Sequence, residues 1–391
     1  MSTPFFLSAV LLFCRIFDKL TTVDSVKLLK LLMMNRLNYK WTGAFLLAGA
    51  LLFSAMQTQA AVGESFKLGL LQYTILTENE TGGTVSVERN GQISGDIKIP
   101  KVVKKGAIKY NVTELRPFAF FEAGGLTSVT VPEGVTTLGE RAFYSCKGLT
   151  KVTLPATLTK IGDSAFFKCV SLKEITVAPE CTAFSSQDGV LFDKEKTSLI
   201  FYPPGKTTTD YTIPDSVRII VDRAFSDCRN LVNVHIGNNL NKIGESAFEH
   251  CNKLANIEIP DGITEIGNRA FSYCESLKNV KIGNNVTKIG ASAFKGCKSL
   301  VSVTMGNSVA EIGYFAFSWC SSLTHVYYNW DVPEAEYDIY AGDPETLISY
   351  YPEENDTWEA VTVGDQWQAR GVASWDPDLK DKEDKEKKDS E

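Results

Sequence analysis

The side chains best suited to acid–base or nucleophilic chemistry in this chain are its three histidines and its carboxylates. His235, His250 and His325 are far apart in the sequence, and none of them belongs to a metalloprotease, hydrolase, P-loop or dinucleotide-binding motif. Glu174 and Glu258 could act as an acid–base pair only if they were close, since glycoside hydrolysis needs carboxylates within about 5–10 Å. We therefore expect no enzymatic activity and no cofactor.

The cysteines follow a regular spacing that argues against metal chemistry. Seven of them recur in register, and the list is Cys146, Cys169, Cys228, Cys251, Cys274, Cys297 and Cys320. Ligands 23 residues apart along a ladder do not converge on a tetrahedron, so we expect no metal site. Equal positions in stacked coils have parallel side chains, whereas a disulfide needs crossed geometry. We expect a buried column of free thiols, with disulfides as the alternative in an exported chain.

A phenylalanine precedes each of these cysteines by three residues and reveals the element that positions them. The phenylalanines recur every 23 residues, apart from one step of 59, and an alanine precedes each one. They are Phe120, Phe143, Phe166, Phe225, Phe248, Phe271, Phe294 and Phe317. One such coil cannot bury its own apolar side, whereas stacked coils form a continuous core. The period predicts a repeat solenoid whose core contains these phenylalanines and cysteines.

One repeat read in full predicts the elements of the coil. Residues 257–259, Ile-Glu-Ile, alternate apolar and polar like a half-buried strand, and Pro260 ends it. Ala270, Phe271 and Cys274 have the three-to-four spacing of a helical or 3₁₀ arc. The predicted fold is an α/β-type solenoid with a parallel β-sheet on one face and short helical or 3₁₀ arcs on the other.

The step of 59 residues predicts an irregular repeat. A degenerate unit falls around Tyr202, and the extra stretch near 184–205 reads as two strands joined at residues 193–197, a hairpin that projects from the stack. Upstream, residues 96–100 form a further strand in register. We expect about ten parallel strands in the ladder, preceded by a β-rich N-terminal cap over residues 61–112.

These residues resemble the BspA-like leucine-rich repeats, whose pattern runs I-G-x-x-A-F-x-x-C-x-x-L. Residues 161–172 follow it, from Ile161-Gly162 through Ala165-Phe166 to Cys169. The resemblance covers residues 113–330 and implies an exported protein that acts in adhesion and protein binding, with a host matrix or cell-surface protein as partner. Arg116 and Val221 replace the repeat glycine, so this position does not strictly require a positive φ.

Residues 34–60 have the composition of a secretory signal peptide. Arg36 and Lys40 precede an apolar run over residues 43–56, and small residues follow, with cleavage expected after Ala60. An uncleaved membrane anchor is the alternative. We expect translation to start at Met33 or Met34, which leaves residues 1–33 outside the natural product. The expected location is secreted or cell-surface, with the periplasm as a further option.

The segments after the repeats are an aromatic-rich C-terminal cap over residues 331–375 and a solvated charged tail over 376–391. Trp330, Trp358, Trp367 and Trp375 offer an alternative, because sugars stack on aromatic faces. The net charge of −7 and a pI near 5.3 argue against a nucleic-acid partner.

The outward residues of the parallel strands line one continuous face, which is the natural binding surface of a solenoid. The candidate binding residues are Lys151, Glu174, Asn233, His235, Asn256, Glu258, Asn279, Lys281, His325 and Tyr327. We expect the strongest contacts at the end formed by His325, Tyr327, Tyr328 and Trp330. The predicted function is protein–protein interaction or adhesion. The alternatives are a glycan-binding module that uses the C-terminal aromatics and a structural component of the envelope.

Overall fold

The computed structural model describes residues 62–79, 81–89, 92–353, 355–359 and 366–375. The predicted extension at 1–33, the signal peptide at 34–60 and the tail at 376–391 lie outside these residues. Within the described part, no helix has both the length and the apolar character needed to cross a membrane.

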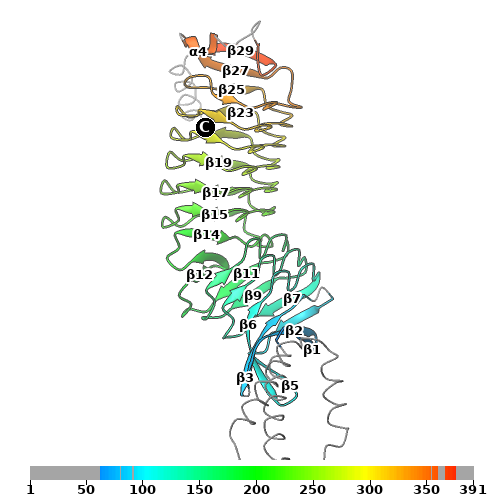
Figure 1. Ribbon diagram of the computed structural model, residues 1–391. Coiled ribbons are helices and arrows are strands. Elements are labelled where there is room, and N and C mark those ends of the chain that lie inside the picture. Colours follow the sequence, from blue (N-terminus) through cyan, green and yellow to red (C-terminus); the bar gives the residue numbers. More distant parts are fainter. Residues whose placement is uncertain (1–61, 80, 90–91, 354, 360–365, 376–391) are drawn as a thin grey trace, which may run out of the picture. The chain divides into compact units, whose positions relative to one another are not determined.

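The predicted strands of the repeats form a parallel ladder along one side of the coils, as Figure 1 shows. The ladder is interrupted once, so that it consists of two sheets. The first contains β4 (Ser94–Lys98), β7 (Gly125–Thr130), β9 (Lys151–Leu154) and β11 (Glu174–Val177). The second begins with β15 (Asp210–Thr212), β17 (Asn233–His235), β19 (Asn256–Glu258), β21 (Asn279–Lys281), β23 (Ser302–Thr304) and β25 (His325–Tyr327).

A further set of parallel strands, absent from the prediction, runs along another side of the coils. Each strand has two residues and lies just before the position of the repeat glycine, which is valine after β16 and glutamate after β26. They are β8 (Thr137–Leu138), β10 (Lys160–Ile161), β16 (Ile219–Ile220), β18 (Lys242–Ile243), β20 (Glu265–Ile266), β22 (Lys288–Ile289), β24 (Glu311–Ile312) and β26 (Glu334–Ala335). The core therefore lies between two sets of strands.

The predicted helical arcs are wrong, because the Ala-Phe-x-x-Cys segments are successive turns. Around Phe248, the residues Ser246 and His250 have φ values of 52° and 62°, which no right-handed helix allows. The reason is hydrogen bonding between coils. The amide of Phe248 donates to the carbonyl of Ala270 in the next coil at 2.7 Å, and the amides of Ser246 and His250 donate to the same coil.

Stacked rings and buried thiols form the core of the coils. The ring centroids of Phe248 and Phe271 are 5.2 Å apart with an interplanar angle of 6°. The thiol of Cys274 donates to the carbonyl oxygen of Phe248 in the preceding coil, with 3.2 Å between the atoms. All eight described cysteines are buried and free of disulfides. A cysteine here fills a small apolar space and also satisfies a buried carbonyl group.

The residues before the repeats form β strands that lead into the ladder. Sequential strands pair antiparallel, and β3 then pairs parallel with β6. These strands are β1 (Ser65–Leu68), β2 (Leu71–Asn79), β3 (Gly82–Val87), β5 (Val102–Lys105) and β6 (Ile108–Leu115).

The hairpin near residues 184–205 is part of a sheet, whereas the prediction made it project from the stack. Its strands β12 (Phe184–Gln187), β13 (Val190–Asp193) and β14 (Ser198–Phe201) pair antiparallel, and β14 then pairs parallel with β16. Tyr202 takes the phenylalanine position, because its amide donates to Ala224 and its ring centroid lies 5.1 Å from that of Phe225.

The aromatic segment after residue 330 was expected to lie outside the repeat, and this was wrong. The ladder continues through β27 (Ile348–Pro352) and β29 (Arg370–Trp375), which also pairs with β28 (Gln366–Trp367). Tyr340 extends the phenylalanine column, with its ring centroid 6.1 Å from that of Phe317. A short helix, α4 (Asp356–Glu359), places Trp358 in the core.

Candidate binding surface

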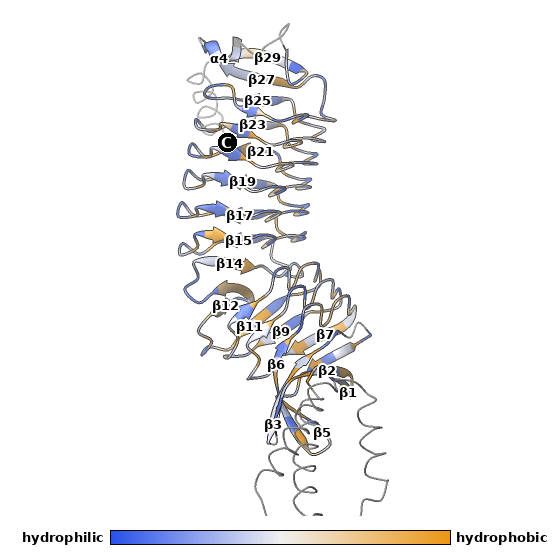
Figure 2. Cartoon of the chain, viewed as in Figure 1, coloured by the Kyte–Doolittle hydropathy of each residue, from blue (hydrophilic) through white to orange (hydrophobic). Residues whose placement is uncertain are grey.

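Two columns of side chains run along the outward face of β15 to β25, which we call the strand face. The parallel register places equal positions of successive coils side by side. The first, the amide column, contains Asp210, Asn233, Asn256, Asn279 and Ser302. The second, the mixed column, contains Thr212, His235, Glu258, Lys281 and Thr304. Figure 2 shows β17, β19 and β21 as hydrophilic.

Hydrogen bonds connect neighbours within the amide column. Asn233 Nδ2 donates to Asp210 Oδ2 at 3.2 Å, and Asn256 Nδ2 donates to Asn233 Oδ1 at 3.3 Å. Further along, Ser302 Oγ donates to Asn279 Oδ1 at 2.9 Å. The side chains are thereby ordered on the surface before any partner binds, so that less side-chain conformational entropy is lost on binding.

The mixed column contains one acidic and one basic side chain in adjacent coils. Glu258 and Lys281 occupy paired register positions, and the His235 ring nitrogen Nε2 lies 3.2 Å from Asp210 Oδ1. These groups are exposed, and exposed ion pairs add little to stability. Each of these groups can therefore leave its present neighbour and pair with a charged group of a partner at a small cost in free energy. Such pairs favour a defined orientation of the partner and specificity.

Three rings gather at the end of the strand face toward the C-terminus. The ring centroids of Tyr327 and Tyr350 are 5.0 Å apart, and those of His325 and Tyr350 are 5.6 Å apart. The rings are nearly parallel, with interplanar angles of 18° and 12° for these pairs. We call His325, Tyr327 and Tyr350 the aromatic end. Sequence reasoning missed Tyr350, although it follows Tyr327 by one repeat period.

Two residues predicted at this end differ in their environment. Tyr328 is buried in the core, where its hydroxyl lies 2.6 Å from that of Tyr340. It therefore cannot contact a partner at the surface, and its prediction as a contact residue was wrong. Alternation along a strand explains this, because Tyr327 points outward and its neighbour points inward. Trp330 is exposed.

Lys151 and Glu174 lie on the other sheet of the ladder and are separated from the columns by the interruption. Lys151 Nζ lies 3.3 Å from Glu174 Oε1. The hydroxyl of Thr176 and then the ammonium of Lys151 lower the pKa of the Glu174 carboxyl. The structure thus brings together the candidates from Asn233 to Tyr327 on one surface, and places Lys151 and Glu174 apart from them.

Two of the four tryptophans proposed as a sugar platform, Trp358 and Trp367, are in the core. Trp358 and Trp367 are 0% and 7% exposed, and Trp358 Nε1 donates to the backbone carbonyl of Trp330 at 3.0 Å. Buried faces cannot stack on a glycan, so the prediction was wrong for Trp358 and Trp367. The side chain of Trp375 lies outside those that the structure describes.

The described residues contain no group of three histidine, cysteine or acidic side chains that could hold a metal ion. Burial raises the pKa of the Cys274 and Cys297 thiols, which disfavours the nucleophilic thiolate. The surface geometry suits recognition by many weak contacts.

Comparison with known proteins agrees with this architecture. Residues 102–190 and 198–324 match a family model described as the BspA type leucine rich repeat region, in six copies. The pneumococcal vaccine antigen PcpA has a similar fold, with a TM-score of 0.58, 22% identity, and coverage of 81% of this chain and 99% of that chain. A leucine-rich repeat protein from Eubacterium ventriosum gives a TM-score of 0.53 at 18% identity, covering 78% and 100% of the two chains. No curated protein sequence matches the chain.

Proposed function

Because the chain belongs to the BspA-type leucine-rich repeat family, we propose that it is an exported or surface-exposed protein that binds a protein partner through its strand face. The observation that carries this proposal is the pair of columns on β15 to β25 with the aromatic end beside them. Solenoids use extended faces of this kind for binding. The proposal includes no catalysis.

A protein partner fits this surface better than a small molecule does. The contact groups are spread over successive coils rather than gathered in a cavity. Amides, a histidine and the charges of Glu258 and Lys281 supply hydrogen bonds and orientation, and the three rings supply apolar contact at one end. The partner class that the family suggests is a host matrix or cell-surface protein.

Export is supported by the composition of residues 34–60, which have a basic start, an apolar run and small residues before the expected cut. Fractionation of cells that express the chain, combined with N-terminal sequencing of the exported product, tests this part. A product that begins at residue 61 is the expected result. Retention in the cytoplasm with an intact N-terminus would contradict it.

The binding experiment screens the purified protein against immobilised extracellular-matrix proteins and glycans. Variant one changes Asn233, His235, Asn256 and Glu258 to alanine, and variant two changes His325 and Tyr350 to alanine. The control changes Tyr314 and Trp319, which are exposed but lie away from the strand face. Each variant is first checked for an unchanged thermal midpoint.

A protein ligand that is lost in variants one and two but retained in the control is the expected result. Each lost ring should weaken binding at least tenfold if the aromatic end is central to the contact. Glycan binding that persists in both variants would place the function elsewhere. If the protein binds none of the immobilised proteins or glycans and instead associates with itself, the result would favour the structural envelope role.

A further inference from the structure

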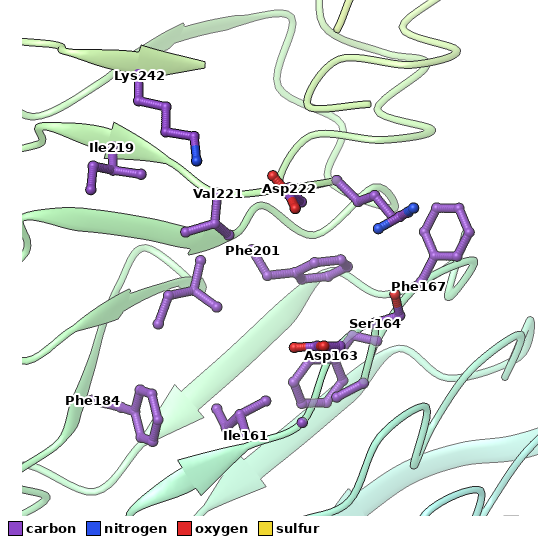
Figure 3. A pocket seen from close by; sticks show the side chains of 15 residues that line it. Ile161, Asp163, Ser164, Phe167, Phe184, Phe201, Ile219, Val221, Asp222 and Lys242 are labelled. Atoms are coloured by element: carbon purple, nitrogen blue, oxygen red, sulfur yellow. The ribbon is translucent and has the colours of Figure 1, made fainter. Parts of the chain in front are cut away.

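The ladder is interrupted after β11, and the set of two-residue strands is interrupted after β10. A cleft opens at this interruption, and we call it the seam cleft. It has a volume of about 480 Å³. One wall is the continuous stretch of residues 161–167, and the other includes Ile200, Phe201, Val221 and Asp222. Figure 3 shows Ile161, Asp163 and Ser164 on the first side and Val221 and Asp222 on the second. Neither β10 and β14 nor β11 and β15, which belong to successive coils, are paired across this seam.

The first wall is a backbone edge that lacks the regular hydrogen bonds to its next coil, although the rings of Phe166 and Phe201 are in contact with their centroids 5.7 Å apart. One coil earlier, the amides of Arg141, Phe143 and Ser145 donate to the carbonyls of residues 163, 165 and 167 at 2.8–3.0 Å. After the seam, the amides of Arg223, Phe225 and Asp227 donate in the same way to residues 245, 247 and 249. The equivalent amides at the seam belong to Ser164, Phe166 and Lys168, and no described residue accepts from them.

The carbonyl group at this edge shows the same interruption. In the regular ladder, the amide of Gly162 donates to the carbonyl of Leu138 and that of Gly244 donates to Ile220. The equivalent carbonyl at the seam belongs to Ile161, and within the described residues it has no donor from a following coil. Three donors and one acceptor therefore lie along one edge in the spacing that a second polypeptide backbone would satisfy.

The repeat glycine is replaced by a valine at position 221, which lines the cleft. The equivalent position is glycine in the neighbouring regular coils because a Cβ atom would strike the preceding coil, 2.4 Å from the amide nitrogen of Glu140 at Gly162. At Gly244 the same atom would lie 2.6 Å from the amide nitrogen of Asp222. The coil before Val221 is two residues shorter at this position, since Leu199 and Tyr202 are three residues apart where Ile220 and Phe225 are five apart. The amide of Val221 still donates to the carbonyl of Leu199 at 3.1 Å.

The interior of the cleft is apolar. Phe184, Ile200, Phe201, Ile219 and Val221 line it, and Ile219 is 37% exposed. Charged groups of both signs stand at its border, namely Asp163, Asp222, Arg223 and Lys242. A water-filled cleft would leave these apolar side chains hydrated, so an occupant with apolar side chains gains free energy by displacing the water.

We propose that the seam cleft binds an extended peptide segment of a partner protein by addition to the edge of residues 161–167. The segment supplies backbone carbonyls at alternate residues to the amides of Ser164, Phe166 and Lys168. It places small or apolar side chains against Ile219 and Val221. This site is independent of the strand face, and it would remain if the strand face bound nothing.

The test measures amide hydrogen exchange of the purified protein with and without a probe peptide. The probe is the acetylated and amidated peptide of residues 242–249, Lys-Ile-Gly-Glu-Ser-Ala-Phe-Glu, because this stretch covers the equivalent edge in a regular coil. A scrambled peptide of the same composition is the control. Without peptide, the amides of Ser164, Phe166 and Lys168 should exchange faster than those of Arg141, Phe143 and Ser145. At ten times its Kd, the probe should slow the three seam amides roughly tenfold.

Two variants make the site assignment specific. Ile219→Glu puts a charge at the cleft and should abolish the protection by the probe. Val301→Glu changes an equally exposed apolar residue away from the cleft and should leave the protection intact. If the seam amides exchange slowly without peptide, the edge is closed and the proposal fails. If millimolar probe protects them no more than the scrambled peptide does, the proposal fails as well.

Discussion

Asp343 occupies the coil position that Cys320 holds one repeat earlier, and its Oδ1 atom accepts a hydrogen bond from the amide of Cys320 at 2.6 Å. The carboxylate thus ends the cysteine column. Its other oxygen, Oδ2, has no hydrogen-bond partner among the described residues. Arg370 Nη2 donates instead to the backbone carbonyls of Asp343 and Tyr340.

The pH dependence of stability should follow from this carboxyl group. Burial raises the pKa of Asp343 from 3.8 to about 8. The folded state therefore holds the proton more tightly than the unfolded state, and the contribution to stability is full below pH 4 and is lost as the pH rises to about 8. The free energy of unfolding should fall by up to about 1.4 kcal/mol per pH unit in this window.

The variant Asp343→Asn should remove this slope, because the amide keeps the acceptor for Cys320 and does not ionise. Urea unfolding at pH 5, 6, 7 and 8 measures the effect. Asp261→Asn is the matched control, since Asp261 is exposed and also accepts a backbone amide, that of Asn284. An equal slope in the parent and in Asp343→Asn would refute the assignment.

The repeat glycine should tolerate no side chain inside the regular ladder. In Gly267→Ala the new Cβ would lie 2.7 Å from the carbonyl carbon and oxygen of Gly244, so the coils must separate. We expect a loss of roughly 1–3 kcal/mol or more. Val221→Ala at the same repeat position faces the seam cleft and should cost about 1 kcal/mol or less. Chemical unfolding of both variants measures the two losses of stability. Equal losses would contradict the position of Val221 at the cleft.

The thiols should be inert in the folded protein. All eight described cysteines are buried, and burial raises the pKa of Cys274. A thiol reagent such as Ellman's reagent should therefore leave them unmodified in native buffer and modify them after unfolding in guanidinium. Rapid native labelling at Cys146 through Cys320 would show that the coils open. Cys274→Ala should cost about 1–3 kcal/mol because it leaves a small cavity in the core and because the carbonyl of Phe248 keeps only one of its two donors, the amide of Cys251.

The two ends of one tryptophan hydrogen bond should differ sharply in their effect on stability. Trp358 is fully buried and Trp330 is 62% exposed, although the indole of the first donates to the backbone of the second. Trp358→Ala should destabilise the protein by about 3–5 kcal/mol. Trp330→Ala keeps the backbone acceptor and should change stability by about 0.5 kcal/mol or less. Thermal and urea unfolding measure both, and similar losses would argue against the continued ladder.

Much of the coil could be predicted because its neighbours in space are its repeats in sequence. Phe248 and Phe271 are one period apart and stack directly, so the spacing of phenylalanines already contains the core contact. The same holds for the outward residues Asn256 and Asn279, which the register pairs. The turn conformation around Phe248 could not be predicted from the repeat period. Its spacing suits a helix equally well, and only the hydrogen bonds to the next coil decide between them.

The C-terminal coils show where pattern reading ended. Tyr340 keeps the period of Phe317, but the cysteine and leucine positions around it change, so the repeat was not seen there. Tyr350 was missed at the aromatic end for the same reason. Trp358 and Trp367 were predicted to belong to a cap, with a sugar platform as the alternative, because nothing in their local sequence tells which faces the core covers.

The sequence by itself determined the repeat, its core residues and the strand register, since each of these depends on contacts between equal positions of stacked coils. Only the tertiary structure decided where the ladder is interrupted, which aromatic side chains are buried and which backbone groups stay open at the seam. Those features arise from contacts between unlike segments, such as Phe166 with Phe201 across the seam. No period in the chain records such contacts.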